Sequence, residues 1–477
     1  MTDKPQTSDA QSDRKPGWAD LFRDGHGLYT VLLNLGIGLH ALDIFIINTV
    51  MPSVVEDIGG HAYYTWPTMI YMVGSIMGAA CGFHMRTSLG QRRGYMWGGI
   101  VMLVGTIGCA LPPDMASLLV ARFVKGLGGG FIMSQTMMLI RGLYSPRIRT
   151  RMLGTITTTW SIAAIIGPAI GGIFAELEWW RGAFWTTVPF GVLFIWMVWR
   201  HVPLGEATEP HRRLPWRRLL LLGAGVTAVG LTGNFENVWI GGGLVALAIA
   251  MVWGTFKLDA NADEGLFPKR PLSLRTPVGL AYWSFFLLSA THSALLIFAP
   301  LFLIVLHDVT PLYVGYLSLV FSIAWTVGAL TVAGFSETYE RIAAVGGFTL
   351  AAFATAGFTV AVLSGTQFVI SAMVSLIGVG IGASNVLITS YGMSIPRQGE
   401  EGVTISSMPT IRSIGVAFGA ATAGLIANSA GLDQNMSRET VANVALWVLG
   451  ATAVIPALAA LCTFRAVTWG WSYRTDQ

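Results

Sequence analysis

The stretch LHALDIFIINTVMP, residues 39–52, places an acid, Asp43, inside an otherwise apolar run. No side chain close to it along the chain would obviously neutralise the carboxylate. A charge held in hydrocarbon costs several kcal/mol, and acids inside membrane spans usually mark ion or substrate pathways. If this run crosses a membrane, Asp43 is therefore a candidate functional residue.

The composition of the chain indicates a membrane protein. The chain has 477 residues, of which 53% are hydrophobic and 11% charged, and its mean hydropathy is +0.61. An ordinary soluble domain is about 25% charged. We therefore expect an all-α integral membrane protein with many spans. The polar first 25 residues lack the apolar core and cleavage site of a secretory signal, so we expect the first span to be retained.

Sequence signals for catalysis and for bound metals are missing. The three cysteines lie far apart in apolar runs, without disulfide or metal-ligand spacing. No H-E-x-x-H or G-x-S-x-G pattern and no histidine cluster occurs in the sequence. We therefore expect no enzyme activity, no catalytic residues, no metal and no cofactor other than a proton gradient.

Apolar stretches of about 18 residues or more predict fourteen membrane spans. They lie near residues 28–51, 65–87, 95–113, 116–140, 152–176, 183–200, 217–233, 237–254, 277–305, 311–334, 341–365, 366–392, 404–430 and 441–468. An even number places both termini on one side of the membrane. Arg181 and Arg438 are the only basic residues in the loops of the other side, so the positive-inside rule makes both termini cytoplasmic. The net charge of +4 thus reflects topology, and no nucleic-acid partner is expected.

The spans are arranged as six helices, a pair and six more helices. Two six-helix halves joined by a charged segment are typical of transporters whose substrate site lies between the halves near the midplane. The expected segments are a cytoplasmic tail (1–27), a six-helix bundle (28–200), linkers with an inserted two-helix hairpin (201–276, hairpin about 217–254), a second six-helix bundle (277–468) and a cytoplasmic tail (469–477). We expect the inserted hairpin to be structural.

Helix depth suggests partners for Asp43. With a rise of about 1.5 Å per residue, Asp43 lies about 12 Å inside the outer end of the first span. Arg122 and Lys125, in the fourth span, lie about 9 Å and about 14 Å from the same face. These two basic residues are three positions apart and share a helix face, as do His40 and Asp43. The acid and the two bases are therefore expected at one depth.

This arrangement can couple proton binding to a change of shape. A carboxylate paired with Arg122 stays ionised, whereas one that loses its partner in a dry cavity takes up a proton. A pair that opens and closes would then make Asp43, Arg122 and His40 the proton-coupling residues. The alternative is a buried ion pair that only holds the helices together.

At these residues the sequence resembles the drug:proton antiporters of the major facilitator superfamily, in particular their fourteen-helix branch. The first span reads LDIFIINTVMP, similar to the branch pattern L-D-x-T-I-V-N-V-A-L-P, and matches its acid at Asp43 and its asparagine at Asn48. The segment WPTMIY sets Trp66 and Tyr71 at the W-x-x-x-x-Y spacing of the branch. The resemblance implies a proton-coupled antiporter.

Further segments along the chain carry the same resemblance. In the fourth span ARFVKGLGGG resembles R-x-x-Q-G-x-G-x-G, which implies that Arg122 is the proton-relay arginine. GPAIGG, residues 167–172, resembles the antiporter signature of the fifth helix, and EWWRGAFWTTVPFG resembles the segment that follows it. DEGLFPKRPLSLR and IRSIGVAFGAATAG resemble the later linker and the thirteenth helix. The resemblance covers nearly the whole chain.

Small residues form close-packing faces in several spans. Three G-x-x-x-G pairs allow helix backbones to approach closely. They are Gly126 and Gly130, Gly167 and Gly171, and Gly415 and Gly419. In the GPAIGG signature, which ends at Gly172, Pro168 removes one helical hydrogen bond and can bend the fifth span near the depth of Asp43. These features suit helices that rock and reseal, and static packing is the alternative.

The loop after the second span, GFHMRTSLGQRRG, resembles the cytoplasmic gate motif of the superfamily, G-x-L-x-D-R-x-G-R-R. It matches the motif at Gly90, Arg92 and Arg93 but carries Thr87 where the motif has an acid. The inner-gate contact of that acid is therefore left open. Arg92 and Arg93 can equally act as positive-inside anchors.

Charge inside the spans bears on the substrate. Lys125 stands where the family usually has glutamine, and Asp43 is the only acid among the charged or titratable residues well inside the spans. Charge complementarity therefore favours an anionic, zwitterionic or neutral amphipathic substrate over a cationic one. The candidate substrate-cavity residues are Lys125, Asn48, Trp66, Tyr71, His292, Asn385 and Arg412.

The sequence thus predicts a proton-coupled secondary transporter that exports small amphipathic compounds by alternating access. We expect it in the inner or plasma membrane, with the substrate, protons and membrane lipids as partners and no obligate protein partner. An importer of a siderophore, peptide or organic acid would use the same fold in the opposite direction. A membrane-embedded enzyme is a weaker alternative.

Overall fold

The computed structural model describes residues 17–23, 25–60, 63–207, 214–234, 237–262, 265–432 and 437–475. Every regular element in these residues is a helix, and none of them forms a strand, so the expected all-α fold is confirmed. Most of the expected tail 1–27, part of the linkers and the last two residues of the expected tail 469–477 lie outside the described residues. The expected domain boundaries stay a prediction.

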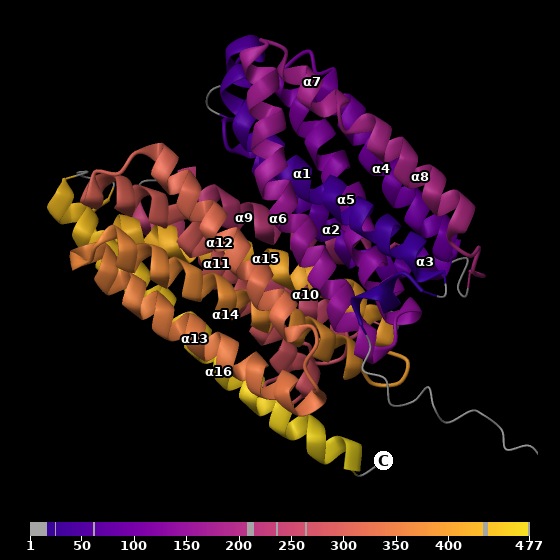
Figure 1. Ribbon diagram of the computed structural model, residues 1–477. Coiled ribbons are helices and arrows are strands. Elements are labelled where there is room, and N and C mark those ends of the chain that lie inside the picture. The colour runs from indigo at the N-terminus through magenta and orange to yellow at the C-terminus, as the bar shows by residue number, and fades with distance from the viewer. Residues whose placement is uncertain are drawn as a thin grey trace, which may run out of the picture.

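The helices form two groups that lie side by side, with a pair between them in the sequence (Figure 1). The N-half, which follows the short turn η1 (Trp18–Leu21), comprises α1 (His26–Ile58), α2 (Trp66–Ala80), α3 (Gly82–Leu89), α4 (Gln91–Ala110), α5 (Met115–Leu143), α6 (Pro146–Glu176), α7 (Trp180–Trp185) and α8 (Val188–His201). The pair comprises α9 (Trp216–Gly230), the turn η3 (Leu231–Asn234) and α10 (Val238–Ala260). The C-half comprises α11 (Pro277–His307), α12 (Pro311–Val332), α13 (Glu337–Ser364), α14 (Gln367–Ser394), α15 (Glu401–Ser429) and α16 (Arg438–Thr475).

Several helix starts follow directly from local sequence. Asp114 caps α5 by accepting a hydrogen bond of 2.8 Å from the backbone N–H of Ser117. In the C-half, Thr276 and Thr310 each precede a proline and accept a backbone N–H three residues later. A short polar side chain at the cap satisfies one free N–H, and proline at the next position is already set for the helix.

The number of membrane spans is only partly supported. Eleven helices of the described residues are long and apolar enough to cross a membrane, and twelve if α2 and α3, bent by 48°, count as one span. The other two expected spans fall on α4 and α9, which lie outside this set. The 15 residues of α9 extend about 22 Å, less than a hydrocarbon core of about 30 Å. The expected count of fourteen stays a prediction.

The glycine faces bring helix backbones together within each half. On α5, Gly126 and Gly130 lie against backbone carbonyls of α2, and a methyl group at either position would overlap them. On α6, Gly167 and Gly171 pack against side chains of α1, whereas Gly172 has no atom nearby. On α15, Gly415 and Gly419 lie against the backbone of α11. Six of these seven glycines therefore serve packing.

The two halves meet through α2 and α5 against α15 and through α6 against α12 and α14. Polar contacts between them include Ser161 with Thr326 at 2.6 Å between hydroxyl oxygens, and Thr150 donating to the carbonyl of Ala333 at 3.5 Å. These contacts run toward the end of the molecule where α1 begins and α16 ends, which we call the terminal face. Away from the terminal face the two groups diverge, with α7 at the far end of the N-half (Figure 1).

The pair α9 and α10 packs across the line where the halves meet. Helix α9 contacts α2 of the N-half, and both α9 and α10 contact α15 of the C-half. A buried acid holds the pair together, since Asp259 near the end of α10 forms an ion pair with Arg218 of α9 and accepts backbone N–H groups of Leu266 and Phe267, both at 2.8 Å. The sequence analysis did not predict these contacts of Asp259.

Candidate functional site

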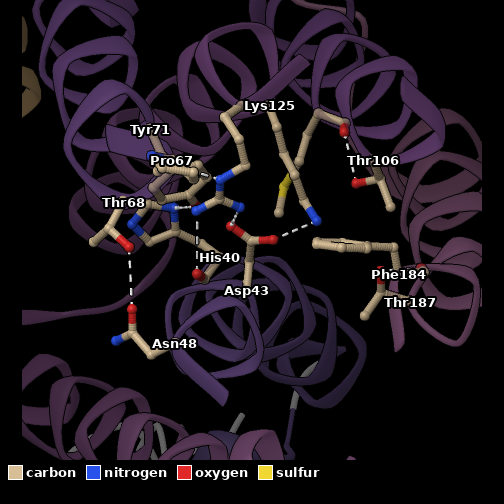
Figure 2. A network of polar contacts seen from close by, with 12 residues as sticks. His40, Asp43, Asn48, Pro67, Thr68, Tyr71, Thr106, Lys125, Phe184 and Thr187 are labelled. Atoms are coloured by element: carbon tan, nitrogen blue, oxygen red, sulfur yellow. Dashed lines mark hydrogen bonds and ion pairs between the residues drawn. The ribbon is translucent and has the colours of Figure 1, made fainter. Parts of the chain in front are cut away.

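Asp43 lies in the centre of the N-half, sealed from solvent between two cations. Its side chain is 1% exposed, and those of Arg122 and Lys125 are 0% and 1% exposed. Arg122 donates through Nη1 to Oδ2 of Asp43 at 2.5 Å. Lys125 Nζ contacts Oδ1 as an ion pair without the directionality of a hydrogen bond (Figure 2). The structure thus brings together the three residues that the sequence placed at one depth.

Both cations are held in place by further contacts. Arg122 donates through Nε to the carbonyl of Pro67 at 3.0 Å and lies 4.4 Å from the ring centroid of Tyr71. Lys125 Nζ lies 4.9 Å from the ring centroid of Phe184 in α7. A ring face attracts a cation more strongly when both are desolvated. The Nη2 atom of Arg122 is buried and has no acceptor in the described part of the chain, so one donor of the cluster is left unused.

His40 lies beside the acid but is not bonded to it. Its Nδ1 atom is 2.7 Å from the hydroxyl of Tyr71, and its ring also lies edge-on to Trp160 of α6, with the centroids 5.9 Å apart. Tyr71 therefore contacts His40 through its hydroxyl and Arg122 through its ring face. The expected proton-coupling role of His40 stays a prediction. In this state no hydrogen bond joins His40 directly to Asp43, so a proton has no direct path between them.

Two other expected cavity residues lie nearer the far end of the N-half. Asn48 is exposed, and its Oδ1 accepts a hydrogen bond of 3.0 Å from Thr68 (Figure 2). Trp66, at the start of α2, stacks edge-on against Tyr63 with the centroids 5.6 Å apart. Neither side chain joins the cluster around Asp43.

The C-half holds a second group of the expected residues at mid-depth. The ring of His292 in α11 stacks on Phe321 of α12 and lies edge-on to Trp325, at 5.4 Å and 5.1 Å between centroids. Arg412 of α15 is half-buried and close enough to His292 to interact electrostatically. Asn385 of α14 is 7% exposed, and its Oδ1 atom has no hydrogen-bond partner in the described residues.

The segment that resembles the gate motif forms α3 and the start of α4, and its Gly90 and Arg92 make contacts within the N-half. Gly90 has a φ of +81° and lies against the backbone of Gly205, in the segment after α8. Arg92 donates through Nε to the carbonyl of Val202 at 2.5 Å, and Arg93 is exposed. At this level the contact to the C-half is made by Phe83, which lies against Gly402. In this state Gly90 and Arg92 therefore hold the segment that follows α8, whereas Arg93 does not.

Sequence reasoning missed several residues that shape both groups. Phe184, Trp160, Phe321 and Trp325 pack on the charged or titratable side chains, and the carbonyl of Pro67 holds Arg122. Aromatic residues are common throughout the apolar spans, so no sequence signal marks the ones that lie next to a charge. No group of three or more His, Cys, Asp or Glu side chains in the described residues could hold a metal ion.

Known proteins resemble this chain along most of its length. A probable multidrug-efflux transporter of Mycobacterium tuberculosis is 27% identical over 430 residues, which cover 87% of this chain and 90% of that protein. The multidrug transporter protein MdtP of Bacillus subtilis is 25% identical over 405 residues, covering 82% of this chain and 73% of that protein.

Solved structures show the same fold. The human organic anion transporter MFSD10 superposes with a TM-score of 0.68 at 14% identity, over 92% of this chain and 99% of that one. The proton:xylose symporter XylE superposes with a TM-score of 0.65 at 13% identity, over 91% and 94%. At such identities the likeness concerns the fold alone.

The family assignment rests on the sequence. The family described as Major Facilitator Superfamily matches residues 33–420, well over half of the chain. The fold agrees with this match, and the relatives are transporters and not enzymes. The chain belongs to the major facilitator superfamily of membrane transporters.

Proposed function

We propose that the chain is a proton-coupled exporter of small amphipathic compounds that works by alternating access. The observation that carries this proposal is the buried cluster of Asp43, Arg122 and Lys125. Asp43 is the only acid well inside the expected spans, so a proton that moves with transport has one carboxylate to bind there. The relatives named as multidrug transporters support export over import.

The cluster is placed where a proton can influence the contact between the halves. Protonation of Asp43 would cancel its attraction to Arg122 and Lys125 and leave two like charges side by side. Both cations are carried by α5, and α5 packs against α15 of the C-half. A shift of α5 would therefore reach the contact between halves that closes this state toward the terminal face.

Alternating access then follows from differential binding. We propose that the termini are cytoplasmic, as the basic loops favour, so that the described state is closed toward the cytoplasm. A proton arriving from outside would favour opening toward the cytoplasm, and substrate bound from the cytoplasm would favour proton release. Each ligand can shift the equilibrium only by its difference in affinity for the two states.

Proton flux in liposomes tests this proposal. Purified wild type and Asp43→Asn are reconstituted with a pH dye inside, and cationic, neutral and anionic amphipathic compounds are added in turn. We expect one class of compound to trigger proton movement in wild type and not in Asp43→Asn. Asp57→Asn is the matched control, because Asp57 pairs with Arg181 at the exposed end of α1. Equal flux in wild type and Asp43→Asn would make the cluster a packing device.

The direction of coupling needs a second condition in the same vesicles. An antiporter accumulates its substrate in vesicles that are acidic inside, because outward proton flow drives substrate inward. A symporter accumulates it in vesicles that are acidic outside. The second result would favour the importer that the sequence left open.

A further inference from the structure

Arg412, a cation deep inside the spans of the C-half, has no partner among the described residues in this state. Arg412 makes no hydrogen bond and no ion pair with any described residue, although it lies well inside the membrane-spanning part of α15. Every acid of residues 277–468 belongs to a helix end or a connecting segment, so no acid in the spans of the C-half could neutralise Arg412. An unpaired charge at this depth is costly and is usually kept for function.

The helices bring Arg412, Asn385 and His292 to the same space. Gly392 of α14 lies against Phe285 of α11 and Met408 of α15, and this contact forms a floor. Asn385 lies seven residues from Gly392 on α14, and His292 lies seven residues from Phe285 on α11. Arg412 lies four residues from Met408 on α15. Residues at these spacings share one face of a helix, so all three lie on the helix faces that meet at the floor. Since α14 runs opposite to α11 and α15, all three lie on the same side of the floor.

The distances from the floor set the order of the groups. Arg412 leaves its helix about 6 Å above the floor, and Asn385 and His292 leave theirs about 10 Å above it. The rings of Phe321 and Trp325 pack around His292 at that level. All of these side chains except Asn385 are half-buried. A cation thus lies below an aromatic surface, and a buried amide lies at the level of the rings.

The charges of both halves favour an anion in this space. Asp43 already contacts two cations, so the cluster of the N-half carries one net positive charge, and Arg412 adds another. No described carboxylate at this depth is free to bind a cationic compound. The planar guanidinium of Arg412 suits a carboxylate, sulfonate or phosphate group, which it can bind through two parallel hydrogen bonds.

We propose that Arg412, with the side-chain amide of Asn385 as a second polar contact, binds the anionic group of the substrate, while the apolar part of the substrate lies on Trp325 and Phe321. This site would make the substrate an aromatic or otherwise flat organic anion. The proposal rests on the proposed transport function, because it names the substrate class of that transporter. It is independent of proton coupling, which concerns the other half.

A pair of matched probes tests the proposal. The probes 8-anilinonaphthalene-1-sulfonate and N-phenyl-1-naphthylamine share one ring system and differ in the sulfonate. Binding is measured by equilibrium dialysis against the full-length protein in nanodiscs, with empty nanodiscs subtracted. We expect wild type to bind the sulfonate about tenfold more tightly than the neutral probe, as a charge-assisted hydrogen bond allows. Equal affinity for the two probes in wild type would overturn the proposal without any variant.

Variants locate the preference. Arg412→Gln should lower the affinity for the sulfonate about tenfold and leave the neutral probe unchanged. Trp325→Ala should weaken both probes by a similar factor and keep the preference. Arg438→Gln is the matched control, because Arg438 pairs with Asp308 at the exposed end of the same half. A folded Arg412→Gln protein that keeps the sulfonate preference, or loses affinity for both probes equally, would overturn the proposal.

The result separates this proposal from the proposed function. The dialysis experiment needs neither a gradient nor a direction of transport. If the sulfonate preference depends on Arg412 but no compound drives proton flux, the binding site stands and proton coupling fails. If compounds drive proton flux but the preference is unaffected by Arg412→Gln, proton coupling stands and the anion site fails.

Discussion

The two halves of this transporter treat a charge inside the membrane in opposite ways. In the N-half, Arg122 is sealed from solvent and bonded to Asp43, to a backbone carbonyl and to an aromatic face. In the C-half, Arg412 is half-buried and bonded to nothing among the described residues. The carboxylate of a buried ion pair can take up and release a proton, whereas an unpaired guanidinium is available to bind a ligand. The comparison suggests that the N-half serves proton coupling and that the C-half serves substrate binding.

The largest expected difference between the halves is the change in the free energy of unfolding when the buried arginine is replaced. Arg122→Met should lower the free energy of unfolding by about 3 kcal/mol, because it removes one partner of a buried ion pair. Arg412→Met should leave this free energy unchanged or raise it, since it removes a buried charge that has no partner. Unfolding in mixed detergent micelles, followed by circular dichroism, measures both. Equal losses would show that the contrast between the arginines is wrong.

Glycine packing between helices should contribute equally to stability in the two halves. Gly130→Ala on α5 and Gly419→Ala on α15 should each cost about 2 kcal/mol, because the added methyl group would overlap the backbone of α2 or α11. Gly172→Ala is the control, since no atom lies near that position and alanine favours a helix. Thermal unfolding of the three variants checks this. A loss at Gly130 alone would mean that the halves also differ in rigidity.

The two histidines sharpen the comparison at a smaller scale. His40→Phe should cost about 1 kcal/mol, because the buried hydroxyl of Tyr71 loses its partner at 2.7 Å. His292→Phe should change stability less, since His292 makes ring contacts that phenylalanine can replace. The same unfolding assay compares them, with Tyr71→Phe added to the first variant. The double variant should recover part of the loss if the hydroxyl is its cause.

The smallest expected effect lies at the helix caps outside the spans. The hydrogen bond from the N–H of Ser117 lowers the pKa of the Asp114 carboxyl, which caps α5. A lowered pKa in the folded state means that this stabilisation is present above the ordinary pKa of the acid and is lost as the pH falls through the folded value. Wild type should therefore be more stable than Asp114→Asn at pH 7, and the difference should shrink at pH 3.

The threonine cap of α12 offers the control for that pH dependence. Thr310 accepts the N–H of Tyr313 at 3.3 Å and does not titrate in this range. The stability difference between wild type and Thr310→Ala should be the same at pH 7 and at pH 3. A parallel change in both differences would point to a general effect of acid on the detergent-solubilised protein.

Much of the architecture could be predicted because it depends on residue type and order. Each expected span falls on one helix or on two adjacent helices, and the length of an apolar run reflects the thickness of a bilayer. The pairing of Asp43 with Arg122 and Lys125 could also be predicted, since depth along a helix follows from residue count and a buried acid needs a partner. Helix starts at Thr-Pro pairs are equally local.

Other features depend on which helix faces meet. The resemblance named Trp66 and Asn48 as cavity candidates, and in the structure neither side chain joins the cluster around Asp43. The segment 82–94 resembles an inner-gate motif, whereas in the structure its Arg92 binds the segment after α8 of its own half. The rotation of each helix about its axis is set by packing against several neighbours at once, and no single segment of sequence contains that information.

The sequence by itself thus determined the membrane class, the family resemblance, the helical segments and the acid that needs neutralising. Only the tertiary structure decided that His40 bonds to Tyr71 and not to the carboxylate, that α9 and α10 pack across the line between the halves, and that Arg412 has no partner among the described residues. The physical reason is the distance along the chain over which each interaction acts. Hydropathy, capping and helix depth act within a few turns of one helix, while the partner of a buried charge is chosen by contacts between helices far apart in the chain.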